Sequence, residues 1–323
     1  MFWKRNYDRI VADVKAGLNI IGIWESNPYI TERTRGNFYM KIFDILVSVI
    51  LGIVEGITEW LPVSSTGHMI LVNQFLTFSD DKFTEMFLVV VQLGAIMAVV
   101  LLFWKKIFPF NLRPKKNEPV VKMDIMQMWF KILVATIPAA VIGVLFDDVI
   151  NEMFYNQIVV AGALIIYGVL FILVESWNKG RRPVITSVQE LTYQTALIIG
   201  IFQLLAAIIP GTSRSGATII GALIIGVSRG VAAEFTFYLA IPVMFGASLL
   251  KIVKSISDGL SYGPMAVTTL VIGMLVAFIV SLFVIKFLMA YIRRHDFKCF
   301  GYYRIVLGII VIAYFAISGA AVI

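Results

Sequence analysis

Six apolar stretches of the sequence approach the ~20 residues that a helix needs to cross the hydrocarbon core of a bilayer. Of the 323 residues, 59% are hydrophobic and only 15% are charged. A soluble domain could not bury so large an apolar share, because its surface must carry many polar groups. The sequence therefore predicts an all-α integral membrane protein. The expected spans are Met86–Trp104, Phe130–Phe146, Ile158–Val174, Val231–Leu250, Pro264–Leu288 and Ile305–Ile323.

Charge and cysteine content narrow the class further. The net charge of +7 needs no nucleic acid to explain it, since positive residues at membrane edges set the orientation of a membrane protein. Cys299 is the one cysteine, which excludes an internal disulfide and a thiolate metal cluster. We expect a lipid bilayer as the partner of this surface, and no nucleic acid.

A motif that occurs twice divides the membrane region. The stretch from Gly52 to Ser65 returns from Gly200 to Ser213, with Gly, Glu or Gln, Pro and Ser recurring in the same register. Three spanning stretches follow each copy. Recurrence of this kind is typical of membrane proteins that are built from two related halves, so we expect two repeats.

Each copy of the motif reads as a hairpin rather than as a span. Proline ends the apolar part (Pro62, Pro210), and a turn of Ser, Thr and Gly follows. The next apolar pieces, Met69–Leu76 and Ile219–Val227, are too short to cross. Such irregular backbone at membrane depth is tolerated only inside protein or beside a wet cavity. We therefore expect each half to hold one re-entrant helical hairpin and three transmembrane helices.

One hairpin plus three crossings reverses the orientation of the second half. The result is an inverted-topology repeat whose hairpin tips meet near the middle of the membrane. The expected division is residues 40–190 for the first repeat and residues 191–323 for the second. Residues 1–39 form an N-terminal extension with two interpretations: an amphipathic arm at the interface, or an addition upstream of a natural start at Met40.

Loop charges indicate which side faces the cytoplasm. Basic residues gather in loops that this topology places on one side, whereas the loop with Asp147, Asp148 and Glu152 has none and the loop near Ser257 has few. By the positive-inside rule the basic side is cytoplasmic, so the first hairpin and both chain ends lie outside. The basic residues are Lys105, Lys106, Arg113, Lys115, Lys116, Lys122, Lys179, Arg181, Arg182, Arg293, Arg294 and Lys298.

Two carboxylates stand close together in the first hairpin. Glu55 and Glu59 are four residues apart and therefore share one helix face. In a low-dielectric setting the pair should share a proton or bind a cation. A hard divalent ion such as Mg²⁺ or Ca²⁺ suits oxygen ligands. The alternative is that one carboxylate pairs with Arg214 and the other is solvated in a cavity.

The first turn combines hydroxyls with an imidazole. Ser64, Ser65, Thr66 and His68 fall within five residues, at a helix N-terminus where anions are favoured. A serine needs a base to become a nucleophile, and His68 or Glu59 could supply one. Alternatively, the hydroxyls serve only as helix caps.

The second turn contributes a permanent positive charge. Arg214 lies between hydroxyl residues and can grip phosphate oxygens through its planar fork. Together the two turns hold what phosphoryl transfer requires, namely a nucleophile, a base and a charge clamp on the phosphate. The candidate phosphate-binding residues are Arg214, Ser64, Thr66, Ser213, Ser215 and Thr218.

At these two turns the chain resembles a known family. The stretch from Glu55 to His68 is similar to the first signature of the bacterial undecaprenyl-diphosphate phosphatases, also called bacitracin resistance proteins. The stretch from Pro210 to Thr218 is similar to their second signature, and the resemblance runs from about Asp44 to the C-terminus.

The resemblance implies an activity and a role for each residue. It implies hydrolysis of undecaprenyl diphosphate to the monophosphate, with a divalent cation, at the outer face of the bacterial plasma membrane. This step recycles the lipid carrier for peptidoglycan synthesis and confers bacitracin resistance. Glu55 and Glu59 would serve the metal and the base, Ser65 the attack, His68 proton transfer or an alternative attack, and Arg214 the phosphate.

Two other functions compete with this interpretation, namely lipid flipping or secondary transport and a different phosphatase chemistry. A flippase for the polyprenyl phosphate, or a secondary transporter, would use a similar cleft at mid-membrane. A cysteine phosphatase is excluded, because Cys299 and Arg304 have the wrong spacing and are expected on a cytoplasmic loop. Gln92 is expected to form an interhelical hydrogen bond rather than to bind a ligand, and for Glu234 a supporting or structural role stands beside a catalytic one. The nucleophile, the metal, the chain-length selectivity and a homodimer stay open.

Overall fold

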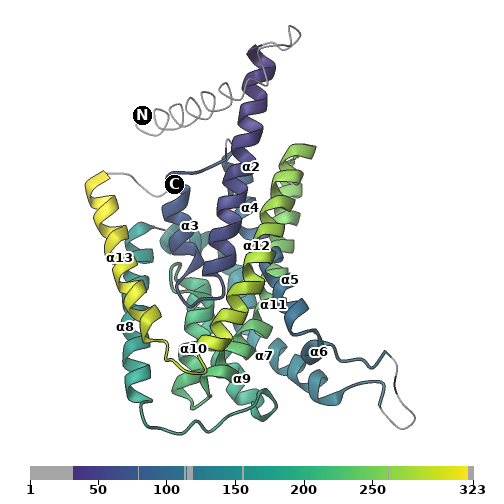
Figure 1. The fold of residues 1–323 in the computed structure, drawn as a ribbon, viewed down its shortest axis with the longest axis vertical. Helices are drawn as coiled ribbons and strands as arrows, with labels where there is room; N and C mark the ends of the chain where they lie inside the picture. The colour runs from purple at the N-terminus through teal and green to yellow at the C-terminus, as the bar shows by residue number, and fades with distance from the viewer. Residues whose placement is uncertain are drawn as a thin grey trace.

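The computed structural model describes a helical membrane protein (Figure 1). It covers residues 32–78, 80–112, 114, 119–154, 156–260 and 262–318, and for 32–40, 147, 148 and 151 it describes the backbone alone. The expectations for residues 1–31 therefore lie outside the described residues, as do those for Arg113, Lys115 and Lys116. Within the described ranges the only β pairing is two isolated bridges, Phe110 with Val121 and Ile185 with Val227.

The helices follow the hydrophobic pattern of the sequence. They are α2 (Glu32–Thr58), α3 (Ser65–Asn73), α4 (Asp81–Val90), α5 (Gln92–Leu102), α6 (Trp104–Ile107), α7 (Met123–Phe154), α8 (Gln157–Trp177), the 3-10 turn η1 (Val188–Glu190), α9 (Tyr193–Ile208), α10 (Arg214–Ile224), α11 (Arg229–Ser257), α12 (Pro264–Tyr291) and α13 (Lys298–Ser318).

Six helical segments of the described residues are long and apolar enough to cross a bilayer, which confirms the expected number of spans. α4 and α5 together form the first, Asp81–Leu102. The last one begins at Lys298 rather than near Ile305. The expectation that Arg304 lies on a cytoplasmic loop is therefore wrong, because α13 begins about two helical turns before Ile305.

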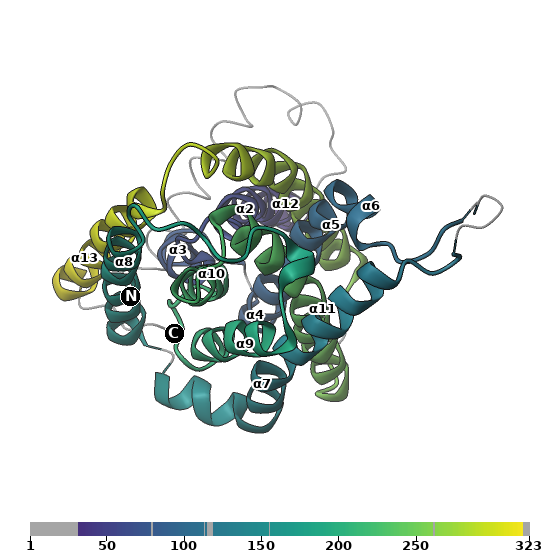
Figure 2. The same ribbon diagram turned by 90° about the horizontal axis from the view of Figure 1, so that it is seen from below.

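Two pairs of helices turn back within the protein. In Figure 1, α2 descends from the upper end and α3 returns beside it, while α9 and α10 form the corresponding pair in the lower half. Seen from below, α3 and α10 lie near the centre, surrounded by the long helices (Figure 2). α3, α9 and α10 are shorter than a span needs.

The packing of the first helix of each pair follows one plan. α2 packs along α12, and α9 packs along α7. The closest approach in each pair is at a glycine: a Cβ on Gly52 would lie 2.6 Å from the carbonyl oxygen of Gly273, and a Cβ on Gly200 would overlap the carbonyl of Ala135. Gly52 and Gly200 are equivalent in the repeated motif, so the two copies use the same device for close helix packing.

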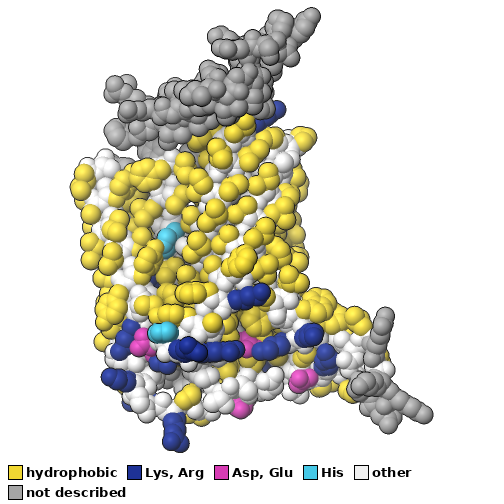
Figure 3. Space-filling view, in the orientation of Figure 1, with side chains coloured by type: hydrophobic (Ala, Val, Ile, Leu, Met, Phe, Trp, Pro, Cys, Tyr) yellow, Lys and Arg dark blue, Asp and Glu magenta, His cyan; other side chains and the backbone are white. Residues whose placement is uncertain are grey.

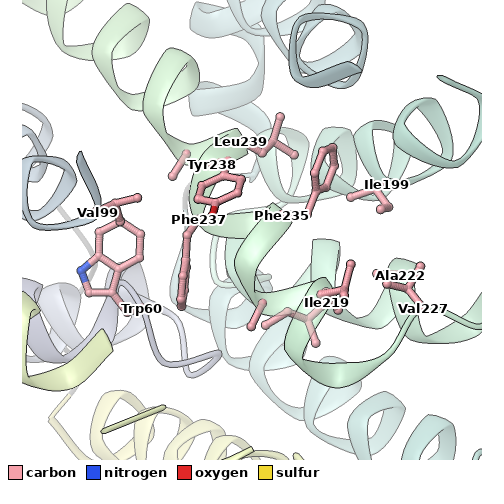
Figure 4. Close-up of a cluster of buried hydrophobic side chains, with 14 of the residues drawn as sticks. Trp60, Val99, Ile199, Ile219, Ala222, Val227, Phe235, Phe237, Tyr238 and Leu239 are labelled. Atoms are coloured by element: carbon pink, nitrogen blue, oxygen red, sulfur yellow. The ribbon is translucent and has the colours of Figure 1, made fainter. Parts of the chain in front are cut away.

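A buried aromatic cluster fills the core beside the turns. Trp60 is fully buried and packs edge to face on Phe237, with ring centroids 5.3 Å apart (Figure 4). Phe237 and Tyr238 belong to α11, so α11 packs against the first turn through the contact of Phe237 with Trp60. The core continues through the aliphatic residues of α10 that Figure 4 labels, Ile219 and Ala222.

Charged side chains collect at one end of the molecule. Figure 3 shows Lys and Arg concentrated near the lower end, while the upper two-thirds of this face is mostly hydrophobic. The ends of α5, α8 and α12 lie toward that end (Figure 1), so the described basic residues of these three connections lie on one side, as the sequence predicts. Such a band of charge beside an apolar belt is typical of a membrane boundary.

Candidate active site

Each turn ends with a serine in a strained conformation. Ser64 and Ser213, with φ of 73° and 70°, are the only described non-glycine residues with positive φ. Each caps the helix that follows: Ser64 Oγ accepts from the Gly67 N–H at 3.2 Å, and Ser213 Oγ accepts from the Gly216 N–H at 3.1 Å. A non-glycine residue in this region is uncommon and costly. The same strain therefore recurs at the same point of both turns.

This geometry corrects the register of the repeat. The sequence pairs Ser65 with Ser213, but the structure makes Ser64 the equivalent of Ser213. The second turn is one residue longer after its proline, and Gly211 in it has a φ of 88° and no room for a side chain. Ser65 therefore corresponds in space to Arg214.

The two turns meet at Glu59. Arg214 Nη2 donates to Glu59 Oε1 at 2.8 Å, and Ser65 Oγ donates to Glu59 Oε2 at 2.7 Å. Ser215 Oγ also donates to the main-chain oxygen of Glu59 at 3.2 Å. Both members of the ion pair are largely buried, with 14% of the Arg214 and 8% of the Glu59 side chain exposed. One carboxylate thus links the hydroxyl of the first turn to the guanidinium of the second.

A cavity of about 150 Å³ opens beside this junction. Six of the candidate catalytic and phosphate-binding residues line it, and α11 supplies apolar lining residues. The six are Glu59, Ser65, Thr66, Ser213, Arg214 and Ser215. α3 and α10 both have their N-termini at this cavity, and helix N-termini favour the binding of an anion.

Among the atoms of the charged side chains at the junction, two have no hydrogen-bonding partner in the described part of the chain. They are Arg214 Nη1 and Glu55 Oε1, and both are buried. Arg214 therefore has one nitrogen on Glu59 and one to offer to a ligand. A buried polar group without a partner is costly, which indicates that a ligand completes this site.

The donor set is suited to a cation that also binds substrate. No group of three or more His, Cys, Asp or Glu side chains lies close enough to hold a metal in the part of the chain that is described. Mg²⁺ is usually held by one or two carboxylates together with substrate phosphates. Glu55, with a free buried oxygen, and Glu59 one turn away match that requirement.

His68 lies apart from the cavity lining. Its Nδ1 is 2.7 Å from the main-chain oxygen of Ser64, and its Nε2 is 2.6 Å from Tyr303 Oη on α13. The base nearest to Ser65 is Glu59 and not His68. Of the two candidates that the sequence offers, the geometry favours Glu59.

Two further candidates are buried outside the cavity lining. Ser64 serves as the cap of α3, which is the alternative considered for the turn hydroxyls. Thr218 donates to the main-chain oxygens of Arg214 and Ser215 and contacts Thr236 Oγ1 at 2.8 Å. Both residues therefore stabilise the main chain of the turns through hydrogen bonds and do not face the cavity.

Arg304 is the residue that sequence reasoning missed. It is fully buried, and its guanidinium donates to Pro62 O in the first turn and to Gly211 O and Thr212 O in the second, at 3.3, 3.0 and 2.8 Å. Its hydrogen bonds thereby connect the two turns. An arginine inside an otherwise apolar helix was the available signal, but the expected span began one residue after it.

Gln92 and Glu234 are the two remaining polar residues that the sequence analysis names. Gln92 lines the cavity, and its Nε2 donates to Leu88 O at 3.4 Å within the same helical run, so the expected interhelical bond is wrong. Glu234 pairs with Lys106 at 2.8 Å and accepts from Tyr238, at a second cavity of about 460 Å³ on the basic side.

Comparison with known proteins gives a consistent result. The family model described as "Bacitracin resistance protein BacA" matches residues 48–310. The undecaprenyl-diphosphatase 1 of Clostridium acetobutylicum is 58% identical over 279 residues, which is 86% of this chain and 100% of that protein. The undecaprenyl-diphosphatases of Acetivibrio thermocellus and Enterococcus faecalis are 59% and 55% identical, over 85% and 86% of this chain and 98% and 99% of their own lengths. The chain belongs to the bacitracin resistance protein BacA family.

Proposed function

We propose that this protein hydrolyses undecaprenyl diphosphate to undecaprenyl phosphate and inorganic phosphate. Recycling of the lipid carrier for cell-wall synthesis, and resistance to bacitracin, follow from that reaction. One observation carries the proposal: Glu59 accepts a hydrogen bond from Ser65 on one oxygen and from Arg214 on the other, at the wall of a cavity. A nucleophile, its base and a phosphate clamp thus meet at one point.

The first step is attack by Ser65 on the terminal phosphorus. The Ser65 Oγ proton passes to the Glu59 carboxylate, 2.7 Å away, as a bond forms between Oγ and phosphorus. The bond from phosphorus to the bridging oxygen breaks, and undecaprenyl phosphate leaves with the electron pair. Arg214 Nη1, which has no partner among the described residues, donates to an oxygen of the transferring group and stabilises its charge.

The second step releases phosphate from the serine. Water attacks the phosphorus, and the bond to Oγ breaks with its electron pair on Oγ. Glu59 returns its proton to Ser65 Oγ, and the protons of the water leave on the inorganic phosphate. Glu59 therefore acts first as base and then as acid. A divalent cation held by Glu55 and Glu59 would neutralise negative charge on the phosphate oxygens.

The membrane arrangement supports access from the outer face. We infer that α2–α3 and α9–α10 are re-entrant hairpins of an inverted repeat in the bacterial plasma membrane. The short α3, α9 and α10, the paired serine caps and the matching glycine contacts of α2 and α9 support this inference. The basic end lies in the cytoplasm by the positive-inside rule, so the first hairpin opens outward.

Single-cysteine labelling in intact cells tests this topology. In a Cys299→Ser background, Ser257→Cys should react with an impermeant thiol reagent, and Lys105→Cys and Arg181→Cys should react only after the cells are permeabilised. Accessibility of Lys105 and Arg181 from opposite faces would refute the inverted arrangement.

The activity test is phosphate release by the purified protein from undecaprenyl diphosphate in detergent. Ser65→Ala should reduce turnover roughly a thousandfold or more, since loss of a nucleophile removes most of the catalysis. Ser176→Ala is the matched control, because its hydroxyl bonds only its own helix at Ile172 O, and it should keep full turnover. Equal rates for the two variants would exclude Ser65 as the nucleophile.

The same assay separates hydrolysis from lipid flipping, because a pure flippase releases no phosphate. The packing does not favour a route through the protein. Ring contacts run from Trp60 through Phe237 and Phe103 to Tyr238, with centroids 5.3, 6.2 and 5.4 Å apart. Trp60 follows Glu59 in the chain and Tyr238 lines the second cavity, so packed rings connect the two places.

A further inference from the structure

His68 has both ring nitrogens engaged by partners that differ in kind. Nδ1 lies 2.7 Å from Ser64 O, which can only accept a hydrogen bond. Nε2 lies 2.6 Å from Tyr303 Oη, which can donate or accept. The partners therefore assign the proton of the neutral imidazole to Nδ1, and leave Nε2 to accept from the tyrosine hydroxyl.

The carbonyl that His68 holds belongs to the peptide bond just before the nucleophile. Ser64 O is part of the peptide that joins Ser64 to Ser65, and Ser64 has the strained φ of 73°. The same oxygen also accepts from the His68 main-chain N–H at 3.4 Å. Rotation of this peptide would move Ser65 away from Glu59. The orientation of the imidazole thus bears directly on the placement of Ser65 Oγ.

Tyr303 holds the imidazole from the other side. The two rings are nearly parallel, with an interplanar angle of 5° and centroids 5.6 Å apart. The next residue of α13 is Arg304, which is fully buried and bonded to both turns. α13 is therefore fixed relative to the turns at the residue beside Tyr303, so the hydroxyl is held at a defined position.

We propose that Tyr303 is a positioning residue for the hydrolysis, acting through His68 on the peptide between Ser64 and Ser65. Its hydroxyl holds Nε2, the imidazole holds the Ser64 carbonyl, and the carbonyl sets the direction of the Ser65 side chain. The proposal rests on the proposed phosphatase activity, with Ser65 as the nucleophile. It gives α13 a role at the site although no residue of α13 lines the cavity.

Tyr303→Phe removes the hydroxyl and keeps the ring. We expect kcat for phosphate release to fall about three- to tenfold, or about 0.6–1.4 kcal/mol at ~1.36 kcal/mol per tenfold, with KM unchanged. The reason is that the substrate-binding groups are untouched and only the geometry of attack is loosened. The matched control is Tyr302→Phe, the adjacent exposed tyrosine of the same helix, which should keep wild-type kcat.

A double-mutant cycle with His68 separates positioning from general stability. In a His68→Gln background, Tyr303→Phe should cause no further loss, since the link to Ser64 is already broken. An unchanged kcat for Tyr303→Phe, or the same loss in both backgrounds, would overturn the proposal. If wild-type protein releases no phosphate, the proposed function fails instead, so the two failures are distinguishable.

Nitrogen NMR gives a readout that does not depend on activity. The chain has only two histidines, so ¹⁵N-histidine labelling yields two imidazoles, and His295→Gln identifies the other one. His68 should carry its proton on Nδ1, and the Nε2 resonance should shift in Tyr303→Phe but not in Tyr302→Phe. A proton on Nε2 in the wild type, or an Nε2 resonance that ignores Tyr303, would contradict the proposal even where His68→Gln is inactive.

Discussion

The two turns share a backbone and differ in chemistry. Both end with a serine that has a positive φ and caps the following helix. At the next position the first turn has Ser65, which donates to Glu59, and the second has Arg214, which also reaches Glu59. In the proposed mechanism neither turn alone could transfer a phosphoryl group, because the first would lack the phosphate clamp and the second the nucleophile. The two copies share a backbone conformation, and the different residues at equivalent positions, Ser65 and Arg214, give the two turns different proposed roles in the reaction.

After removal of the Ser65 hydroxyl, the largest effect should come from a change at Arg214, the residue that makes the second turn different. Arg214→Lys keeps a positive charge but loses the planar fork. A lysine can hold Glu59 or a phosphate oxygen, whereas Arg214 offers Nη2 to Glu59 and Nη1 to a ligand. A charge-assisted hydrogen bond is worth roughly 1.5–3 kcal/mol, so turnover should fall about ten- to a hundredfold.

Its control is an arginine outside the site. Arg181→Lys changes an exposed residue that stacks on Trp177 at 3.9 Å and should leave phosphate release at the wild-type rate. The split between kcat and KM in Arg214→Lys then tells what the fork does. A folded Arg214→Lys protein with unchanged kinetics would mean that Arg214 only neutralises Glu59.

The carboxylate of the first copy has an amide as its counterpart. Glu55 corresponds to Gln203, and both are buried with side-chain atoms that have no partner among the described residues. Glu55→Gln makes the first copy like the second and removes negative charge that would hold a cation. We expect turnover to fall about tenfold, through the loss of roughly 1.4 kcal/mol of transition-state stabilisation.

Gln203→Leu is the matched change in the other copy and should leave turnover unaltered. Titration with Mg²⁺ after chelation adds a second readout, because Glu55→Gln should need more Mg²⁺ for half-maximal rate. Full activity of chelated wild-type protein would remove the metal role of Glu55.

Sequence patterns predicted what depends on local order along the chain. Six spans follow from run length, and the turns follow from Pro62 and Pro210, since α2 and α9 end within four residues of them. The ion pair between Glu59 and Arg214 is what the expected inverted repeat predicts, because opposed hairpins would bring their tips together. These inferences need only periodicity and topology.

The remaining features depend on how helices dock across long sequence separations. Tyr303 is 235 residues from His68, and nothing in the local pattern around either residue announces the contact. The one-residue shift that pairs Ser64 with Ser213 depends on backbone dihedrals that a proline and a glycine permit but do not dictate. Arg304 lies just outside the expected span, because that span begins at Ile305, the first residue of the uninterrupted apolar stretch. In the structure α13 begins earlier and buries the arginine.

The close helix contacts of the two copies should respond alike. Gly52→Ala and Gly200→Ala each drive a methyl group into the backbone of a neighbouring helix. Overpacking of this kind costs about 1–3 kcal/mol, so both variants should unfold at lower temperature in detergent. Gly162→Ala is the control, since nothing lies within 4 Å of its added carbon, and its unfolding temperature should not fall. Loss of stability in only one copy would break the equivalence of α2 and α9.

The smallest effects should come from the serine caps, where two contributions oppose each other. Ser64→Gly and Ser213→Gly lose the side-chain bonds to Gly67 and Gly216, but glycine adopts positive φ without strain. Replacing a cap by glycine costs only a few tenths of a kcal/mol, so the free energy of unfolding should stay within about 0.5 kcal/mol of wild type in both turns. Ser64→Ala and Ser213→Ala lose the cap and keep the strain, and each should cost about 1–2 kcal/mol. Denaturant unfolding of the four variants measures the difference. A glycine variant as unstable as its alanine partner would show that the cap, and not the left-handed backbone, decides the stability of that turn.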